Sequence, residues 1–154
     1  LRALDVDTVV YVDAHWDMRE EYMGERYSHA CVARRLVEEG KKLIFLGVRS
    51  GSKEEWERGR RHVWCGREGW PEVEGKVYIT IDVDAFDPAF APGVGTPEPG
   101  GVDPGTFFAW LRRIPAEVVG ADVVETNPLI EGWITPALAA KIVRELAAKM
   151  IAGP

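Results

Sequence analysis

The sequence predicts an α/β fold in which a parallel sheet is flanked by helices. Three observations lead to this prediction. Short runs rich in Val, Ile and Phe alternate along the 154 residues with segments of helical period, as in βαβ units. The apolar runs are nearly continuous, which is typical of strands buried on both faces. The composition, 46% hydrophobic and 29% charged, fits one globular domain, residues 1–154.

Four strands are expected from the apolar runs. They cover residues 8–14, 42–48, 77–83 and 118–125. Each run is short and rich in β-branched residues, and no repeat, linker or low-complexity tract separates them.

Four helices are expected between and after the strands, at residues 29–39, 53–64, 104–113 and 135–150. Ser52 and Asp103 stand where N-caps belong, and Asp103 precedes a proline. Thr135 is expected to cap the last helix, with Pro136 in its first turn. Gly40 and Gly153 fall where helices are expected to stop.

The charge pattern excludes some partners. Lys and Arg total 19 against 25 Asp and Glu, and the basic residues are scattered, so we expect no nucleic acid partner. No apolar stretch approaches the roughly 20 residues that cross a bilayer, and the first residues lack the order of a secretory signal. These features predict a cytoplasmic protein without a membrane partner.

The scarcity of Asn and Gln indicates the kind of organism from which the protein comes. The chain has no Gln, and Asn127 is its only Asn, whereas Glu, Arg and Lys are plentiful. Proteins from hot environments show this combination of few thermolabile amides and many charges. We therefore expect a thermophile.

Acidic residues collect where the expected strands end. The first strand runs into Asp13, His15 and Asp17, the third runs into Asp82 and Asp84, and the fourth ends in Glu125. The carboxyl ends of parallel strands meet at one edge of a sheet, and side chains two apart on extended backbone face the same way. The sequence therefore predicts one acidic pocket.

Four aspartates in a partly buried pocket need a compensating positive charge. Carboxylates with one imidazole and no thiolate favour a hard or borderline divalent ion such as Mn²⁺, and their number favours a pair of ions. A lone Asp-x-Asp is more often turn chemistry, but both motifs together are specific. His62 is expected only to pack on a helix, whereas His29 could cap a helix or reach the pocket.

Four segments together resemble the signature segments of the ureohydrolases, the arginase and agmatinase family of dimanganese enzymes. They occur in the same order and at similar spacing from about Val9 to the last helix: "DAHWD", "SHACVARR", "IDVDAFDPAFAPGVGTPEPGG" and "DVVETNP". The resemblance implies a three-layer αβα fold and hydrolysis of a guanidinium group to urea and an amine. It also implies trimers or hexamers.

The resemblance assigns roles to the acidic residues. Asp13 and Asp82 look like the carboxylates that bridge two manganese ions, His15 and Asp84 like ligands of one ion, and Asp17 like a ligand of the other. Their shared task would be to lower the pKa of a bridging water, so that hydroxide attacks the guanidinium carbon.

Two further residues resemble the family's substrate-binding and catalytic side chains. Glu125 looks like the carboxylate that binds the guanidinium group, a planar, fork-shaped cation. His29 looks like the histidine that passes a proton to the leaving amine. Ala30 departs from the family's usual glycine. The "PGVGTPEPGG" loop looks like the stretch beside the metals, although it could only brace the pocket.

The main departure from the family is length. Family members are roughly twice as long, and their earlier half holds a Gly-Gly-Asp-His-type segment that completes one metal site. This sequence lacks that segment, so one manganese site is expected to be incomplete. We interpret the chain as the C-terminal half of a longer enzyme, whose first strand would otherwise be an exposed edge. The alternative is a shortened relative.

The substrate is predicted from the loop before His29. Its acidic residues Glu20, Glu21 and Glu25 would repel the carboxylate of arginine and favour the second cation of agmatine. We therefore predict an agmatinase of polyamine biosynthesis, with arginase or guanidinobutyrase as rivals. A non-catalytic metal-binding relative and a single-zinc deacetylase of similar fold remain open.

Overall fold

The protein is built on one parallel sheet, seen in a computed structural model that describes residues 3–65 and 70–154. Residues 1, 2 and 66–69 of the expected domain lie outside the described part. In the order β3-β2-β1-β4-β5, the described strands are β1 (Thr8–Val12), β2 (Lys42–Leu46), β3 (Val63–Cys65), β4 (Gly75–Asp82) and β5 (Ala116–Val124). All neighbouring strands pair in parallel.

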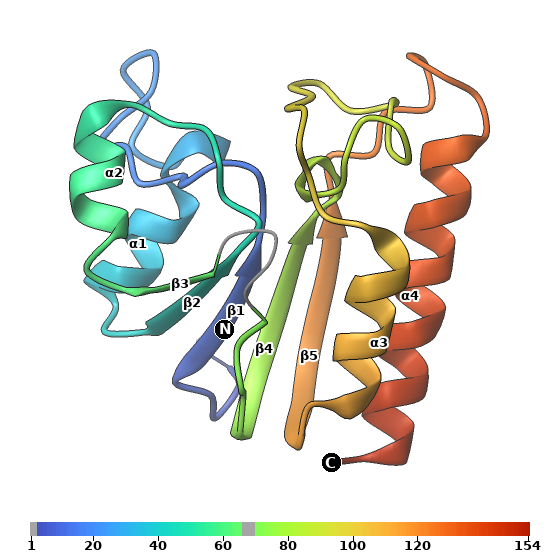
Figure 1. Ribbon diagram of the computed structural model, residues 1–154. Helices are drawn as coiled ribbons and strands as arrows, with labels where there is room; N and C mark the ends of the chain where they lie inside the picture. The colour runs from blue at the N-terminus through green and yellow to red at the C-terminus, as the bar shows by residue number, and fades with distance from the viewer. Residues whose placement is uncertain (1–2, 66–69) are drawn as a thin grey trace.

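Helices cover both faces of the sheet. The described helices are α1 (Val32–Glu38), α2 (Lys53–Gly59), α3 (Pro104–Arg113) and α4 (Ile134–Ala152), and short 3₁₀ turns lie at His29–Cys31 and Val83–Ala85. Figure 1 shows α1 and α2 beside β2 and β3, and α3 and α4 beside β5. The expected αβα layering is confirmed.

Alternate side chains of β1 face two different hydrophobic cores, one on each side of the sheet. Val10 and Val12 belong to the larger core with α3 and α4, whereas Val9 and Tyr11 belong to the smaller core with α1 and α2. Both faces of the central strands are therefore buried, which explains why their sequences are continuously apolar.

Successive strands are added first on one side of β1 and then on the other. The chain runs outward from β1 to β2 and β3, then returns to place β4 on the other side of β1, and continues to β5. A crevice forms at such a switch point, outside the carboxyl ends of the strands. In Figure 1 the loops that follow β1 and β4 gather at the same end of the sheet.

The expectation that the first strand is an exposed edge was wrong. β1 is the central strand and pairs with both β2 and β4. Among the described strands, β3 and β5 form the edges. Chain order does not give sheet order in a parallel sheet, because each crossover can place the next strand on either side.

The helix expected at residues 53–64 is also shorter than predicted. It ends at Gly59, and Val63–Cys65 forms β3 against β2. Its N-terminus was predicted correctly, since Ser52 accepts a bond from the Glu55 amide in a reciprocal capping box. Asp103 caps α3 as expected.

The start of α4 differs from its expectation. Trp133 occupies the N-cap position, and the carboxylate of Glu131 accepts from the amides of Ile134 and Thr135. The hydroxyl of Thr135 accepts instead from the amide of Gly93, 42 residues earlier in the chain. Thr135 therefore ties α4 to the loop that follows β4.

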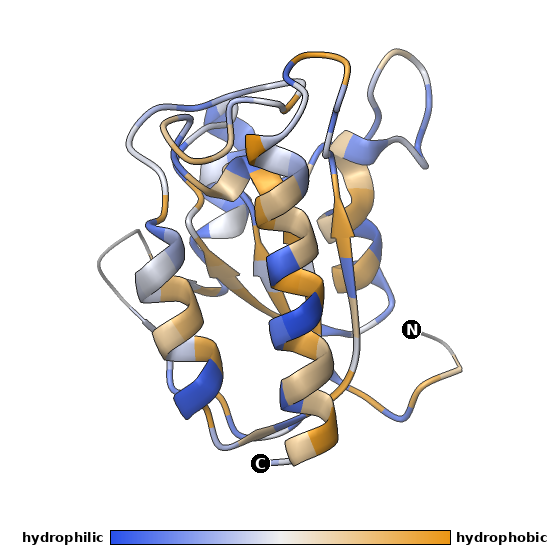
Figure 2. Ribbon diagram, turned by 90° about the vertical axis from the view of Figure 1, so that its right-hand side faces the viewer, coloured by the Kyte–Doolittle hydropathy of each residue, from blue (hydrophilic) through white to orange (hydrophobic). Residues whose placement is uncertain are grey.

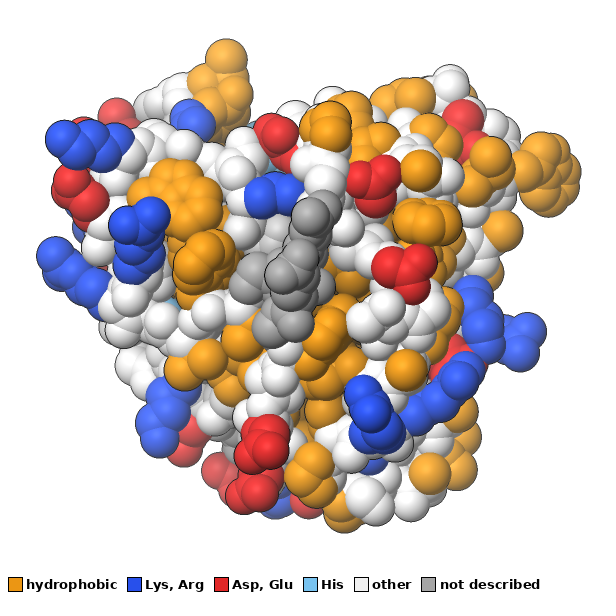
Figure 3. All heavy atoms as spheres, in the orientation of Figure 1, with side chains coloured by type: hydrophobic (Ala, Val, Ile, Leu, Met, Phe, Trp, Pro, Cys, Tyr) orange, Lys and Arg blue, Asp and Glu red, His pale blue; other side chains and the backbone are white. Residues whose placement is uncertain are grey.

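The surface carries charges of both signs and some exposed apolar side chains. Figure 3 shows Lys and Arg interspersed with Asp and Glu on the face of Figure 1. Figure 2 shows α4 from outside, and its exposed apolar residues include Ile134, Val143 and Ile151. None of the described helices has the length and apolar character needed to span a bilayer.

Candidate metal and guanidinium site

The two aspartate motifs meet because β1 and β4 are neighbours. Val12 pairs with Ile81, so both strands end at the same level of the sheet. Asp13 follows β1 directly, and Asp82 ends β4. The predicted acidic pocket is therefore formed at the switch point of the sheet.

Three side chains form a compact group of ligand type at this point. One ligand atom each of Asp13, His15 and Asp84 lies within 4.8 Å of the others. The Nδ1 atom of His15 is 3.0 Å from Oδ2 of Asp84 and 3.4 Å from Oδ1 of Asp13. Both carboxylates are buried, whereas the imidazole is only partly buried, with 25% of its side chain exposed.

The other predicted site residues lie around one cavity with this group. The cavity has a volume of about 610 Å³, and its lining includes His15, Asp17, His29, Asp82, Asp84 and Glu125. Asp13 lies beneath, almost fully buried. The structure thus brings together all seven residues that the sequence indicated.

Burial makes the acidic group electrostatically unfavourable without a cation. Burial and the charges of Asp13 and Asp84 raise the pKa of Asp82 to about 10. Burial raises the pKa of Asp17 to about 6 and also raises that of Asp13. Buried acids that repel one another in this way favour a bound positive charge.

A protonated His15 can supply part of that positive charge. Hydrogen bonds to Asp13 and Asp84 raise the pKa of the imidazole to about 11. Burial alone would raise the pKa of Asp84, but its bonds to His15 and to the amide of Ala14 outweigh burial and lower it. Metal binding would have to replace the proton of His15.

Two site residues have left-handed backbone conformations that are uncommon for side chains other than glycine. Asp17 has φ 49° and Glu125 has φ 63°. The hydroxyl of Tyr11 donates to Asp17 over 2.7 Å. Such strain costs about 1–3 kcal/mol for each residue and is concentrated at functional sites.

Two residues that sequence reasoning missed hold Asp84 in place. The hydroxyl of Thr96 donates to the Asp84 carboxylate over 3.1 Å. The guanidinium of Arg49 donates to the carbonyl of Asp84 over 2.9 Å and also to those of Gly47 and Ala85. The position of Arg49, just beyond β2 at the same edge of the sheet, was the available signal.

The glycine-rich loop both lines the cavity and braces it. Gly95 and Thr96 are among the lining residues, and Oε1 of Glu98 lies 3.7 Å from Nε2 of His15. The carbonyl of Glu98 accepts from Arg49 over 3.1 Å. Asp87, in the preceding turn, accepts from the amides of Gly100 and Gly101. His62, in contrast, lies away from this cavity and packs against Phe45, as expected.

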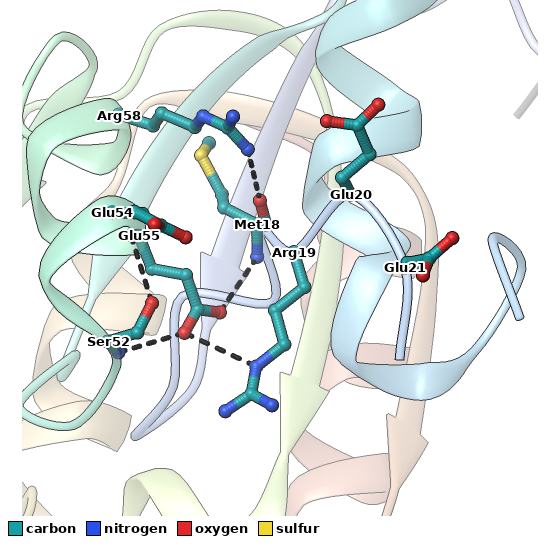
Figure 4. A pocket seen from close by; sticks show the side chains of 8 residues that line it. All are labelled: Met18, Arg19, Glu20, Glu21, Ser52, Glu54, Glu55 and Arg58. Atoms are coloured by element: carbon teal, nitrogen blue, oxygen red, sulfur yellow. Dashed lines mark hydrogen bonds and ion pairs between the residues drawn. The ribbon is translucent and has the colours of Figure 1, made fainter. Parts of the chain in front are cut away.

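The acidic loop residues lie in a different place from the ligands. Glu20 and Glu21 line a second cavity of about 400 Å³ together with Met18, Glu54 and Arg58 (Figure 4). Arg19, Ser52 and Glu55 line both cavities, so the two spaces adjoin. Glu25 is exposed in a turn with Tyr22.

Comparison with known proteins decides the family. The profile described as Arginase family matches residues 4–148. The chain belongs to the arginase family. This arginase-family chain is 41% identical over 161 residues to Arginase 1, mitochondrial, of Arabidopsis thaliana, covering 92% of this chain and 47% of that protein.

Other relatives carry different substrate names. The chain is 36% identical over 155 residues to the N(1)-aminopropylagmatine ureohydrolase of Synechocystis, covering 90% of this chain and 51% of that one. Among solved structures, the agmatine ureohydrolase of Thermoplasma volcanium superposes with a TM-score of 0.83 at 36% identity, covering 97% of this chain and 57% of that chain. The arginase-family chain thus spans about half the length of its relatives, and the substrates in their names differ.

Proposed function

We propose that the protein hydrolyses a guanidinium substrate to urea and an amine, with agmatine, which gives putrescine, as the substrate. The observation that carries the proposal is one cavity lined by metal-ligand side chains, a carboxylate suited to a guanidinium and a histidine. Membership of the arginase family, whose members named above are ureohydrolases and an arginase, agrees with this chemistry.

Two manganese ions would be held by the acidic group. The proposed ligands are Asp13 and Asp82 for both ions, His15 and Asp84 for one, and Asp17 for the other. The donors fit, because they are oxygens and one imidazole nitrogen and because the buried acids raise one another's pKa. Manganese bound there would lower the pKa of a water molecule, making hydroxide available near neutral pH.

Glu125 would bind and orient the substrate. Its carboxylate stands at the end of β5 and lines the cavity beside Asp82 and Asp84. Two carboxylate oxygens can accept parallel bonds from a planar guanidinium, which fixes the angle of the carbon to be attacked.

His29 would give a proton to the departing amine. It opens the 3₁₀ turn His29–Cys31, where Ser28 caps the backbone, and its ring lines the same cavity. One ring nitrogen of an imidazole can donate a proton while the other accepts one, which suits a group that must release and recover a proton in each turnover.

The second cavity supports a substrate with a cationic tail. Its lining has four glutamates, Glu20, Glu21, Glu54 and Glu55, against two arginines, Arg19 and Arg58. The excess of carboxylates would attract an ammonium group more than a carboxylate. Two of the relatives are named for agmatine and aminopropylagmatine, and a third is named arginase.

Urea release with added Mn²⁺ tests the proposal. Agmatine, arginine and 4-guanidinobutyrate are compared, and agmatine should give the largest kcat/KM. Glu125→Gln should lower kcat/KM roughly 100-fold or more, because a neutral amide loses the paired charge, while Mn²⁺ binding is unchanged. Glu117→Gln, at the far end of the same strand, is the control and should retain full activity.

The other outcomes decide between the alternatives. Mn²⁺ binding without urea release from any of the three guanidines would favour a non-catalytic metal-binding relative. One zinc per chain in metal analysis would favour a deacetylase. Full turnover by Glu125→Gln would refute the role of Glu125.

A further inference from the structure

His29 is exposed, so neighbouring side chains must hold its ring if the ring is to keep one orientation. Among the residues that the structure describes, no hydrogen bond or ion pair holds its imidazole. The neighbouring ring is that of Tyr22, with centroids 5.3 Å apart and planes inclined by 70°. Such an edge contact is a favourable arrangement of two aromatic rings.

Tyr22 is itself held in place from two directions. Its backbone exchanges hydrogen bonds with Glu25, at 3.0 and 2.9 Å, which closes a tight turn. The guanidinium of Arg19 lies over its ring, 5.1 Å from the centroid. A cation over an aromatic face is attracted by the negative face of the ring.

Arg19 is in turn anchored to the buried Glu55. Its Nε atom lies 3.5 Å from Oε2 of Glu55, as Figure 4 shows. Glu55 is fixed because it also accepts from the amides of Ser52, at 2.9 Å, and Met18, at 3.3 Å. A carboxylate with several fixed donors at the start of α2 is a rigid reference point for the loop.

The backbone of Arg19 makes a second link to the His29 segment. Its amide donates to the carbonyl of Ala30 over 3.1 Å. The larger cavity is lined by all four residues of this series, Glu55, Arg19, Tyr22 and His29.

We propose that Arg19 and Tyr22 are positioning residues that hold the His29 imidazole over the cavity, with Glu55 as their anchor. The proposal rests on the proton-transfer role of His29 given above. A proton donor works only within hydrogen-bond reach of the group that it protonates. An unsupported ring at an exposed turn would spread over several rotamers, and small misplacements cost large factors in rate.

Nuclear magnetic resonance of labelled histidine side chains tests the positioning without requiring turnover. The chain has only three histidines, at positions 15, 29 and 62, and His29→Gln assigns the resonance of interest. We expect proton contacts between the rings of Tyr22 and His29, and a ring-current shift of His29. Tyr22→Leu should abolish both, Tyr22→Phe should retain both, and Arg19→Met should weaken both.

Tyr27→Leu is the matched control. Tyr27 lies in the same loop but is 86% exposed, so its removal should leave the His29 resonances unchanged. Thermal unfolding is measured for every variant. If Tyr22→Leu fails to fold, Arg19→Met and Tyr22→Phe decide the question.

Urea release by the same proteins provides the second readout. Tyr22→Leu should lower kcat roughly 10- to 100-fold with a smaller change in KM, because the proton donor and not the guanidinium contact is disturbed. Tyr22→Phe should restore kcat. Unchanged His29 resonances in Tyr22→Leu would overturn the proposal, as would an equal loss of kcat in Tyr22→Phe. If the unsubstituted protein releases no urea, the proposed function fails, and the resonances still decide the positioning.

Discussion

Asp84 is held from three sides by other parts of the chain. The amide of Ala14 and the hydroxyl of Thr96 donate to its carboxylate, each over 3.1 Å, and Arg49 holds its carbonyl. The Asp-x-Asp spacing at the end of β4 predicted that Asp84 belongs to the site, although Asp84 lies in the 3₁₀ turn Val83–Ala85 that follows the strand. The spacing could not predict Thr96 or Arg49, because both contacts depend on how loops from separate strands pack.

Trp16, between His15 and Asp17, illustrates a packing constraint on the site. Its ring is fully buried and contacts Phe45 and Trp56 edge-on. A Cβ atom added at Gly59 would overlap this ring. Gly59 therefore allows α2 to approach the segment that carries two predicted ligands.

Gly59→Ala should destabilise the protein by about 1–3 kcal/mol, as overpacked cores do. The higher helix propensity of alanine, worth about 0.5–1 kcal/mol, would offset only part of this cost. Gly132→Ala is the control, because no heavy atom lies within 4 Å of its added Cβ. Urea denaturation measures both, and equal stabilities for the two variants would contradict the packing argument.

At the scale of elements, a helix start could be predicted where nearby residues form the cap. It could not be predicted where the cap depends on contacts with distant parts of the chain. Ser52 and Asp103 cap α2 and α3 through hydrogen bonds to amides three residues later, so the local sequence is enough to predict these two caps. Thr135 bonds Gly93 across 42 residues, which no local pattern reveals. β3 was missed because it has three residues, largely exposed, without an apolar period.

Helices α3 and α4 are joined by a charged contact. Glu145 on α4 accepts two bonds from Arg112 on α3, at 2.8 and 2.7 Å, and also pairs with Lys141. The hydrogen bonds of Arg112 and Lys141 lower the pKa of Glu145 to about 2. Arg112 and Lys141 are exposed to solvent, which screens the charges, so the contact contributes little to stability.

Glu145→Gln should therefore be less stable than the unsubstituted protein at pH 7, and the difference should shrink in acid. The folded pKa is below the unfolded value of about 4.5, so the contribution is present above that value and is lost as pH falls toward 2. Urea denaturation at pH 7 and pH 3 measures it, with Glu117→Gln as the exposed control. A gap that stays constant or grows at pH 3 would refute the assignment.

At the scale of the whole molecule, the site exists because the chain places β4 beside β1, on the side opposite β2. The sequence indicated the seven residues and the edge of the sheet at which they meet. It did not indicate that β1 is central and adjacent to β4, which is the reason why the two aspartate motifs face one cavity. Sheet order depends on the packing of all crossovers together.

Metal binding should stabilise this fold as a whole. At a Mn²⁺ concentration 100 times the Kd, the gain is about 2.7 kcal/mol, which raises Tm by roughly 5–10 °C. A chelator should reverse the shift. Asp84→Asn should lose most of it, whereas Asp87→Asn should keep it, because Asp87 bonds the amides of Gly100 and Gly101 instead. Equal shifts in the two variants would contradict the proposed ligand set.

Anomalous diffraction at the manganese edge, from crystals soaked in Mn²⁺, tests the central claim most directly. We predict anomalous density bounded by Asp13, His15 and Asp84, where three ligand atoms already lie within 4.8 Å of one another. Crystals that contain manganese but show no anomalous density among these three side chains would contradict the account.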